Sequence, residues 1–349
     1  MRFKTYILSS ILGMLFVLLT VSVVVYYVDP YFQYHTPRDD MAYSMNTNDF
    51  SYYNAGIAKS FSYDTVITGS SMSRSFLTSY IDEQFGCHSV KLSMAEARGK
   101  DFSVLLPVVV KNDALKRIII GLDTFAYNVD KDYSAYEKPM HLYDDNPFND
   151  VLYLTNMDGV LKTLDVLRNT KNGGQTTEMD NYQNYAMSNT FSKEKVVKIY
   201  KNSLPIQHNE EFDLESLKAV VTANLNQNLI SIIKDNSDIE FMFYFPPYSI
   251  VRWGMQENPD ADIACMKMLI EELIIYPNVS IYFYQGERAT ITDLEHYMDT
   301  IHFDSVVANK IVDYMADDKN KLTTENYETV LNEFSTFVKN YHYEQLIEE

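Results

Sequence analysis

Two short polar motifs, far apart in the sequence, carry the side chains of nucleophilic catalysis. Ser71 stands directly behind an apolar run and follows Gly69 and Ser70, while Asp299 and His302 stand three residues apart near the other end. A serine hydroxyl is a weak nucleophile and needs a neighbouring base. An imidazole whose Nδ1–H donates to a carboxylate keeps Nε2 free to act as that base. We therefore predict Ser71 as nucleophile, His302 as base and Asp299 as the group that orients the base.

Each motif alone also has an ordinary structural explanation. Gly-Ser-Ser after a strand commonly forms a turn and a helix cap. The Asp-x-x-His motif has Asp293, Glu295 and Asp304 close by, which is equally typical of an acidic surface loop. Whether the two motifs form one catalytic site therefore depends on the strands and helices that would position them.

Five short apolar runs predict the strands of a parallel sheet, because they are continuous rather than alternating. They are residues 64–68, 89–92, 117–121, 239–245 and 279–284. Helical patterns fall between or after them, at 101–112, 213–234, 258–275 and 305–316. This alternation predicts an α/β fold of three layers, with helices on both faces of a five-stranded parallel sheet. Ligands of such folds gather at the carboxyl edge of the sheet, where Ser71 would stand.

The first segment predicts a membrane anchor. Residues 7–28 carry no charged side chain, and about 20 helical residues cross the hydrocarbon core of a bilayer. Arg2 and Lys4 precede the run and Asp29 follows it, so the N-terminus is expected in the cytoplasm and the rest of the chain outside. The run lacks a small-x-small cleavage site, which favours an uncleaved anchor over a signal peptide. We expect a single-pass protein of the cell membrane.

The chain divides by composition into four parts. We predict a cytoplasmic tip and transmembrane anchor at 1–28, a juxtamembrane connector at 29–60, an α/β domain at 61–320 with an insertion at about 123–237, and a helical tail at 321–349. The tail is predicted helical because Phe334, Phe337, Val338 and Tyr341 follow a helical spacing.

Several classes of protein are disfavoured. The formal net charge is −19 and no Lys/Arg stripe stands out, so we expect no nucleic-acid partner. No glycine-rich phosphate loop follows a strand, and His296, His302 and the nearby carboxylates lack the spacing of zinc sites. No cofactor and no metal are therefore predicted. Two buried thiols are the favoured interpretation of Cys87 and Cys265, because a disulfide-stapled domain carries more cysteines, and a single disulfide between them is the alternative.

The order of these motifs along the chain resembles the SGNH (GDSL-like) hydrolase family. Residues 69–71, Gly-Ser-Ser, resemble the family's first block, Gly-Asp-Ser, with Ser70 in the place of the aspartate. Residues 299–302, Asp-Thr-Ile-His, match the Asp-x-x-His of its fifth block. The resemblance extends over most of residues 60–320 and implies a flavodoxin-like sheet with Ser71, Asp299 and His302 as a catalytic triad.

Two other blocks of the family depart from the pattern. The third block, Gly-x-Asn, is Gly-Leu-Asp at residues 121–123. The family's asparagine donates to the oxyanion, and an ionised Asp123 could not, so we expect Asp123 to be protonated or turned away. The resemblance implies that Gly69, Ser70, Gly99 and Asp123 surround the oxyanion, with Gly99 as the glycine of the second block.

Three further stretches narrow the resemblance. Residues 28–31 (Val-Asp-Pro-Tyr), 245–249 (Phe-Pro-Pro-Tyr-Ser) and 292–294 (Thr-Asp-Leu) are similar to those of bacterial membrane-anchored SGNH-like proteins. Those proteins are often encoded beside membrane-bound O-acyltransferases that modify cell-surface polysaccharides. The resemblance implies an extracytoplasmic O-acyltransferase or esterase that acts on a cell-envelope polysaccharide through an acyl-serine, with a membrane-bound O-acyltransferase as partner. The alternative is a non-catalytic glycan-binding or scaffold partner of such an acyltransferase, which Asp123 favours.

A proline-rich stretch after the fourth predicted strand is a candidate for substrate binding. Consecutive prolines stiffen the backbone at 246–247. We predict that Tyr248, Arg252 and Trp253 form a wall on which sugar stacks, and that Ser249 beside them also binds substrate. A rigid turn packed on the core explains the same residues, and the sequence leaves both interpretations open.

Overall fold

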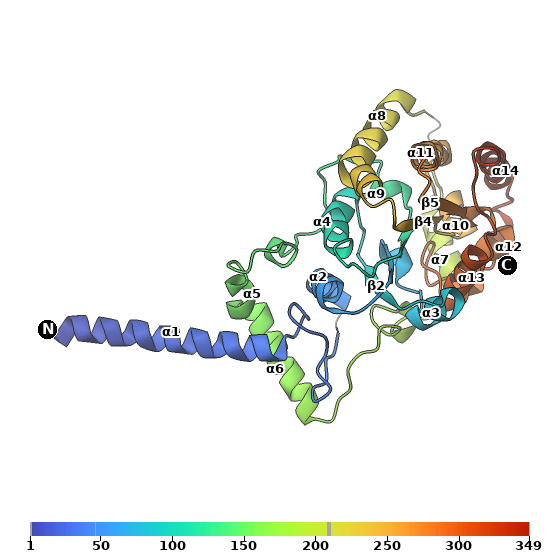
Figure 1. The fold of residues 1–349 in the computed structure, drawn as a ribbon. Helices are drawn as coiled ribbons and strands as arrows, with labels where there is room; N and C mark the ends of the chain where they lie inside the picture. The colour runs from blue at the N-terminus through green and yellow to red at the C-terminus, as the bar shows by residue number, and fades with distance from the viewer. Residues whose placement is uncertain (1, 46, 208–210, 349) are drawn as a thin grey trace. The chain divides into compact units, whose positions relative to one another are not determined.

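One all-parallel sheet organises the larger part of the protein (Figure 1). Its strands are β1 (Thr65–Gly69), β2 (Ser89–Ser93), β3 (Arg117–Gly121), β4 (Glu240–Phe245) and β5 (Val279–Phe283), in the order β2-β1-β3-β4-β5. Every residue of β1 and β2 is buried, as expected for strands covered on both faces. The prediction of a five-stranded parallel sheet is confirmed, and each strand lies within one residue of its predicted bounds.

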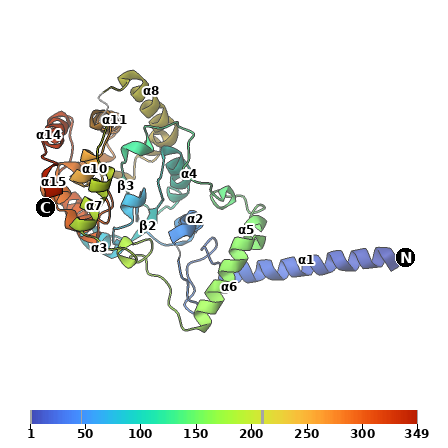
Figure 2. The same cartoon turned by 180° about the vertical axis from the view of Figure 1, so that it is seen from behind.

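Helices cover both faces of this sheet, so the predicted three-layer α/β architecture is also confirmed (Figures 1 and 2). On one side α3 (Thr78–Phe85) packs against α13 (Ser305–Ala316). On the other side α8 (Leu214–Leu225) packs against both α4 (Gly99–Val109) and α11 (Pro259–Leu273). A π-helical turn joins α8 to α9 (Ser231–Asp235), so a helical path runs through the range predicted for one helix.

Shorter elements complete this part of the chain. The helices are α7 (Lys193–Ser203), α10 (Ile250–Gly254), α12 (Arg288–Thr292), α14 (Tyr327–Lys339) and α15 (Gln345–Glu348). The 3-10 turns are η2 (Ser71–Ser73), η3 (Thr124–Ala126), η5 (Tyr185–Met187), η7 (Tyr284–Gly286) and η8 (Leu294–His296), and η6 (Asn226–Ile230) is the π-helical turn. In α14, Phe334 and Val338 are buried, which gives the tail the apolar face that its spacing predicted.

The structure is a computed structural model that describes residues 2–45, 47–207 and 211–348. The chain forms two units. The sheet unit consists of Ser62–Tyr136 and Met179–Glu349, and the anchor unit of Met1–Phe61 and Glu137–Glu178. The anchor unit therefore combines the predicted anchor and connector with a stretch that the sequence analysis assigned to the insertion.

The anchor unit is built on the apolar N-terminal helix. Its elements are α1 (Arg2–Val28), η1 (Thr47–Asp49), α2 (Phe50–Ser60), η4 (Met140–Leu142), α5 (Val151–Thr155) and α6 (Met157–Lys171). Within α1, Phe3–Val28 has a mean hydropathy of 2.6. Among the described residues this is one helix long and apolar enough to cross a membrane.

A buried carboxylate ends α1. Asp29 precedes Pro30, adopts a φ of +45° and accepts hydrogen bonds from the backbone N–H of Tyr34 (2.7 Å) and the hydroxyl of Tyr153 (2.8 Å). The residue before a proline is disfavoured in the helical region, so the helix stops there. Burial raises the pKa of the Asp29 carboxyl against the lowering effect of these hydrogen bonds. The stretch predicted as a connector is thus tied into folded structure.

The helix α2 was missed in the sequence. Its residues include Asn54 and Gly56, which are poor helix formers. Gly56 is needed for a close approach, since a Cβ there would lie 1.8 Å from the carbonyl oxygen of Tyr31. A tertiary contact, rather than local propensity, therefore explains the sequence of this helix.

Candidate active site

The turn after β1 presents Ser71. Gly69 has a φ of +151°, and a Cβ at this position would lie 3.2 Å from the backbone nitrogen of Gly121 on β3. Only glycine suits both requirements. The hydroxyl of Ser70 then caps the turn η2 by accepting from the N–H of Met72 at 3.2 Å. The predicted cap and the predicted nucleophile are therefore adjacent residues of one turn.

Ser71 meets His302 at the carboxyl edge of the sheet. Its Oγ lies 2.8 Å from His302 Nε2, and His302 Nδ1 lies 2.7 Å from Asp299 Oδ2. The serine and the histidine are 231 positions apart in the chain. The structure thus brings together all three residues that the sequence predicted as nucleophile, base and orienting carboxylate.

Asp299 is held in its ionised form. Burial raises its pKa, but hydrogen bonds from the His302 ring and from the backbone N–H groups of His302 and Ile301 outweigh burial and lower it. Both N–H groups donate to Asp299 Oδ1 at 2.9 Å. An ionised Asp299 accepts from the Nδ1–H of His302, which leaves Nε2 as the acceptor for the Ser71 hydroxyl.

The backbone around His302 is fixed from the end of β4. The hydroxyl of Ser249 donates to the carbonyl oxygen of Thr300 at 2.6 Å, and its backbone N–H donates to the same oxygen at 3.2 Å. Ser249 has no exposed surface. Ser249 therefore positions the loop between Asp299 and His302, and its prediction as a substrate-binding residue stays a prediction.

The other three residues predicted as a sugar-binding wall do line one cavity. It has a volume of about 370 Å³, and Tyr248, Arg252 and Trp253 line it together with Thr300 and Ile301 of the loop that carries His302. Trp253 is only 3% exposed, donates from Nε1 to Gln285 Oε1 at 3.0 Å and packs edge-on against Phe334. The tryptophan belongs mainly to the core, as the rigid-turn interpretation expects, and the binding of sugar in this cavity stays a prediction.

Asp123 is a buried acid beside this cavity. It is 1% exposed, and the hydroxyl of Tyr248 donates to its Oδ1. Its Oδ2 is buried and has no partner among the described residues. Burial raises the pKa of Asp123, and the neighbouring hydroxyls of Ser70 and Tyr248 oppose this effect. A protonated Asp123 carries an O–H that can donate, which an ionised one lacks.

Gly99 lies in a helix contact. It is the first residue of α4, and a Cβ there would lie 1.9 Å from Asn224 Oδ1 on α8. Close packing between these two helices explains the glycine without reference to an oxyanion. The role that the resemblance implied for Gly99 stays a prediction.

Tyr185 is a residue of the site that the sequence analysis did not find. Its ring lies against the His302 imidazole, with centroids 4.9 Å apart, and the Arg74 guanidinium lies 5.6 Å from its ring centroid. Burial raises the pKa of Tyr185, while Arg74 and a hydrogen bond with Ser71 act in the opposite direction. Tyr185 thus contacts both the predicted nucleophile and the predicted base.

A buried lysine holds this region in place. The ammonium group of Lys91, on β2, donates to the carbonyl oxygens of Arg74 (3.1 Å), Phe76 (3.0 Å) and Asp180 (3.3 Å). These contacts tie the turn after Ser71 to the segment that leads to Tyr185. Burial lowers the pKa of Lys91 to about 7. A lysine inside a buried strand was the one signal in the sequence that pointed to this arrangement.

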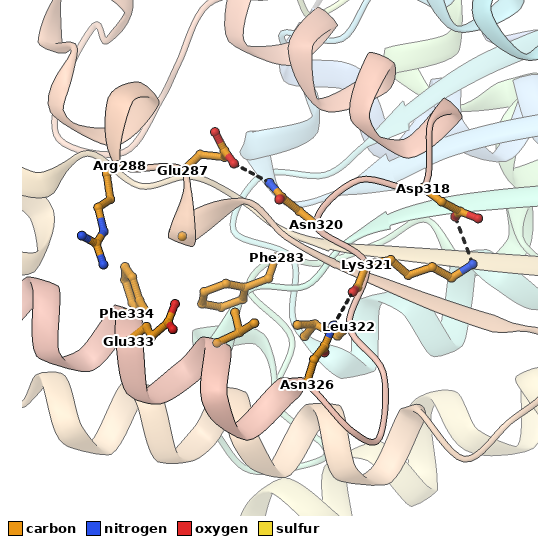
Figure 3. Close-up of a pocket in the computed structure, with 12 residues that line it drawn as sticks. Phe283, Glu287, Arg288, Asp318, Asn320, Lys321, Leu322, Asn326, Glu333 and Phe334 are labelled. Carbon is orange, nitrogen blue, oxygen red and sulfur yellow. Dashed lines mark hydrogen bonds and ion pairs between the residues drawn. The ribbon is translucent and has the colours of Figure 1, made fainter.

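A second cavity, of about 490 Å³, lies between the end of β5 and α14 (Figure 3). Its polar side chains largely pair with one another: Asn320 donates to Glu287 at 2.8 Å, and Lys321 lies 3.0 Å from Asp318. Neither Ser71 nor His302 lines this cavity or the one beside Tyr248, but the latter includes Thr300 and Ile301 of the loop that carries His302. In the part of the chain that is described, no cluster of three or more His, Cys, Asp or Glu could hold a metal ion, and Cys87 and Cys265 are free thiols.

No protein-family model and no curated protein matches the chain. Among solved structures, the chain resembles one described as "a putative platelet activating factor from Streptococcus pneumonia". The sequence identity is 10%, the match covers 78% of this chain and 91% of that chain, and the TM-score is 0.38. A similarity this weak assigns no function to the chain, and the geometry of the site is the basis for the function proposed below.

Proposed function

We propose that the protein is a membrane-anchored SGNH-like serine O-acyltransferase or esterase that acts outside the membrane on a cell-envelope polysaccharide. The observation that carries this proposal is the chain of two short contacts, Ser71 Oγ to His302 Nε2 at 2.8 Å and His302 Nδ1 to Asp299 Oδ2 at 2.7 Å. A serine, an imidazole and a carboxylate in this order are recognised as a catalytic unit by their geometry, whatever the fold.

In the first half-reaction an acyl group moves to Ser71. His302 Nε2 takes the proton of the Ser71 hydroxyl while Oγ attacks the ester carbonyl of the donor. The tetrahedral oxyanion is stabilised by donors at the turn after β1, with the O–H of a protonated Asp123 as a further donor. When the bond to the leaving oxygen breaks, the imidazolium returns its proton to that oxygen, and an acyl-Ser71 ester remains.

In the second half-reaction the acyl group leaves Ser71. His302 removes the proton of a sugar hydroxyl or of water, whose oxygen attacks the acyl-serine carbonyl. When the bond between the acyl carbon and Ser71 Oγ breaks, the imidazolium returns that proton to Oγ and restores the Ser71 hydroxyl. A sugar acceptor makes the reaction a transfer, and water makes it a hydrolysis. The cavity lined by Tyr248 and Arg252 offers an aromatic ring and a charged donor for a sugar.

The location of the reaction follows from α1. This helix is long and apolar enough to cross a membrane, and the basic residues before it favour a cytoplasmic N-terminus. The sheet unit then faces the envelope, where polysaccharide is the acceptor. A membrane-bound O-acyltransferase is the partner that would supply acyl groups from the cytoplasmic side.

The test is Ser71→Ala in the cells that make the protein. We expect this variant to reach the membrane and to abolish acylation of the surface polysaccharide, measured by mass analysis of the isolated glycan. Ser103→Ala is a matched control, since this serine only donates to the carbonyl oxygen of Lys100 within α4. Unchanged acylation in the Ser71→Ala cells would reject the catalytic role.

A further inference from the structure

The anchor unit exposes a continuous apolar helix face. In α6 the buried residues Gly159, Thr163 and Val166 form one side of the helix. On the opposite side Met157, Leu161 and Leu164 are 69%, 53% and 56% exposed. Their spacing of four and three residues aligns them in one stripe. A folded water-soluble protein rarely leaves such a stripe uncovered.

Exposed apolar residues also lie before α6. In α5, Val151 and Leu152 are 53% and 54% exposed, and Phe148 in the preceding turn is 89% exposed. We call Phe148, Val151, Leu152, Met157, Leu161 and Leu164 together the apolar ledge.

Charged residues are sorted around α6. Arg168 stands four residues after Leu164, and Lys171 stands three residues after Arg168, in the last turn. Both therefore extend the line of the apolar stripe. Asp165 lies about 100° further round the helix than Leu164 and four residues after Leu161, so it stands at one edge of the stripe. Basic side chains that continue an apolar stripe are typical of helices that lie in a membrane interface.

The ledge also lies at the end of the apolar helix α1. Both α5 and α6 contact α1, and Val25 and Val28 in its last turns are each 1% exposed. Figures 1 and 2 show α6 crossing the end of α1 where that helix meets the rest of its unit. When α1 spans a bilayer, its outer end reaches the level of the headgroups, and the ledge is then at the same level.

We propose that the apolar ledge is a membrane-binding surface, whose apolar side chains enter the boundary between headgroups and acyl chains in the leaflet from which α1 emerges. Arg168 and Lys171 contact anionic headgroups there. The occupant is lipid rather than protein, because the helices that carry the ledge contact α1, a helix that is itself suited to lipid. This inference concerns the anchor unit alone and does not depend on the chemistry of Ser71.

The test measures how deeply single positions of α6 enter lipid. Full-length protein is reconstituted into nanodiscs of phosphatidylcholine and phosphatidylglycerol, with lipids brominated along the acyl chain as quenchers. Leu164→Trp and Asp165→Trp are compared, and both replaced side chains are exposed. The chain has one tryptophan, Trp253, which is 3% exposed, so its signal is subtracted with the unsubstituted protein.

We expect the tryptophan at position 164 to lose about half of its fluorescence, and the one at position 165 at least about threefold less, because only the first faces the acyl chains. Leu161→Trp should behave like Leu164→Trp. Equal quenching at 164 and 165, or none at either, would overturn the proposal and leave a membrane protein as the occupant of the ledge. Failure of the protein to enter nanodiscs would overturn it as well.

Discussion

Two histidine–aspartate pairs lie within one short stretch of this chain. His302 Nδ1 is 2.7 Å from Asp299 Oδ2, and His296 Nδ1 is also 2.7 Å from Asp304 Oδ2. By the geometry of the carboxylate and the imidazole, the two pairs are alike. They differ in what lies at the other ring nitrogen.

At His302 that nitrogen faces the hydroxyl of Ser71 at 2.8 Å, whereas at His296 it faces the Asp293 carboxylate at 3.8 Å. Asp304 also caps α13 by accepting from the N–H groups of Val306 and Val307. An imidazole oriented by a carboxylate is therefore not sufficient evidence of catalysis. The nucleophile, which arrives from a strand more than two hundred residues away, distinguishes a candidate base from a structural histidine.

The largest difference is expected when each histidine is replaced. His302→Gln should lower ester turnover by roughly 10⁴-fold or more, because Ser71 loses its base. His296→Gln should change it by less than about threefold, since no nucleophile depends on this ring. Initial rates with p-nitrophenyl acetate, measured on both purified variants, check the difference. Equal losses of turnover in the two variants would mean that contact with Ser71 does not identify His302 as the catalytic base.

Replacing the carboxylates of Asp299 and Asp304 should affect two different properties, turnover and stability. Asp299→Asn should lower turnover by about 10²- to 10⁴-fold, because the amide no longer favours the tautomer with Nε2 free. Asp304→Asn should leave turnover nearly unchanged and lower the free energy of unfolding by at most about 1 kcal/mol, through a weaker helix cap. Turnover and urea denaturation measured on both variants give the comparison. A loss of turnover in Asp304→Asn as large as in Asp299→Asn would contradict it.

The smallest effect is expected at Lys91, which helps to position Tyr185. The ring of Tyr185 packs against His302. Lys91 has a pKa of about 7 in the folded protein against an ordinary value of 10.5. Between these values the unfolded chain binds more protons, so the free energy of unfolding should rise with pH, by about 2 kcal/mol from pH 7 to pH 9. Lys91→Met should remove this rise and lower turnover only a few-fold.

Urea denaturation at pH 7 and pH 9, in detergent, measures the effect. Lys116→Met is the control, because the side chain of Lys116 is 77% exposed and pairs with Asp64. If the Lys91→Met and Lys116→Met proteins kept the same pH dependence as the unsubstituted chain, the buried ammonium would not be its source.

The sheet was predictable because parallel strands covered on both faces appear in sequence as short continuous apolar runs. The contact between Ser71 and His302 could be predicted only from two arguments taken together. One is that the carboxyl ends of parallel strands lie at the same edge of a sheet, and the other is the family resemblance. The pair of His296 and Asp304 shows the limit of sequence motifs. From residue type and spacing alone, this pair and the pair of His302 and Asp299 are both candidates for catalysis.

Other parts of the site depend on long-range contacts that no local pattern encodes. Tyr185 lies in a segment without periodicity, and its place over His302 is set by Lys91 and by the hydrogen bonds of Asp180 to Thr78 and Ser79. Ser249 was predicted to bind substrate because it belongs to the proline-rich stretch that ends the fourth strand. Its burial under Thr300 could not be foreseen without the path of the loop.

Covalent labelling of Ser71 by a fluorophosphonate tests the central claim most directly, because the probe reports an activated serine whatever the natural acyl group is. Intact-protein and peptide mass spectrometry on the full-length protein should find one adduct, on Ser71, that disappears in His302→Gln and persists in His296→Gln. An unlabelled Ser71, or labelling that does not depend on His302, would contradict the account and favour a scaffold that binds glycan without chemistry.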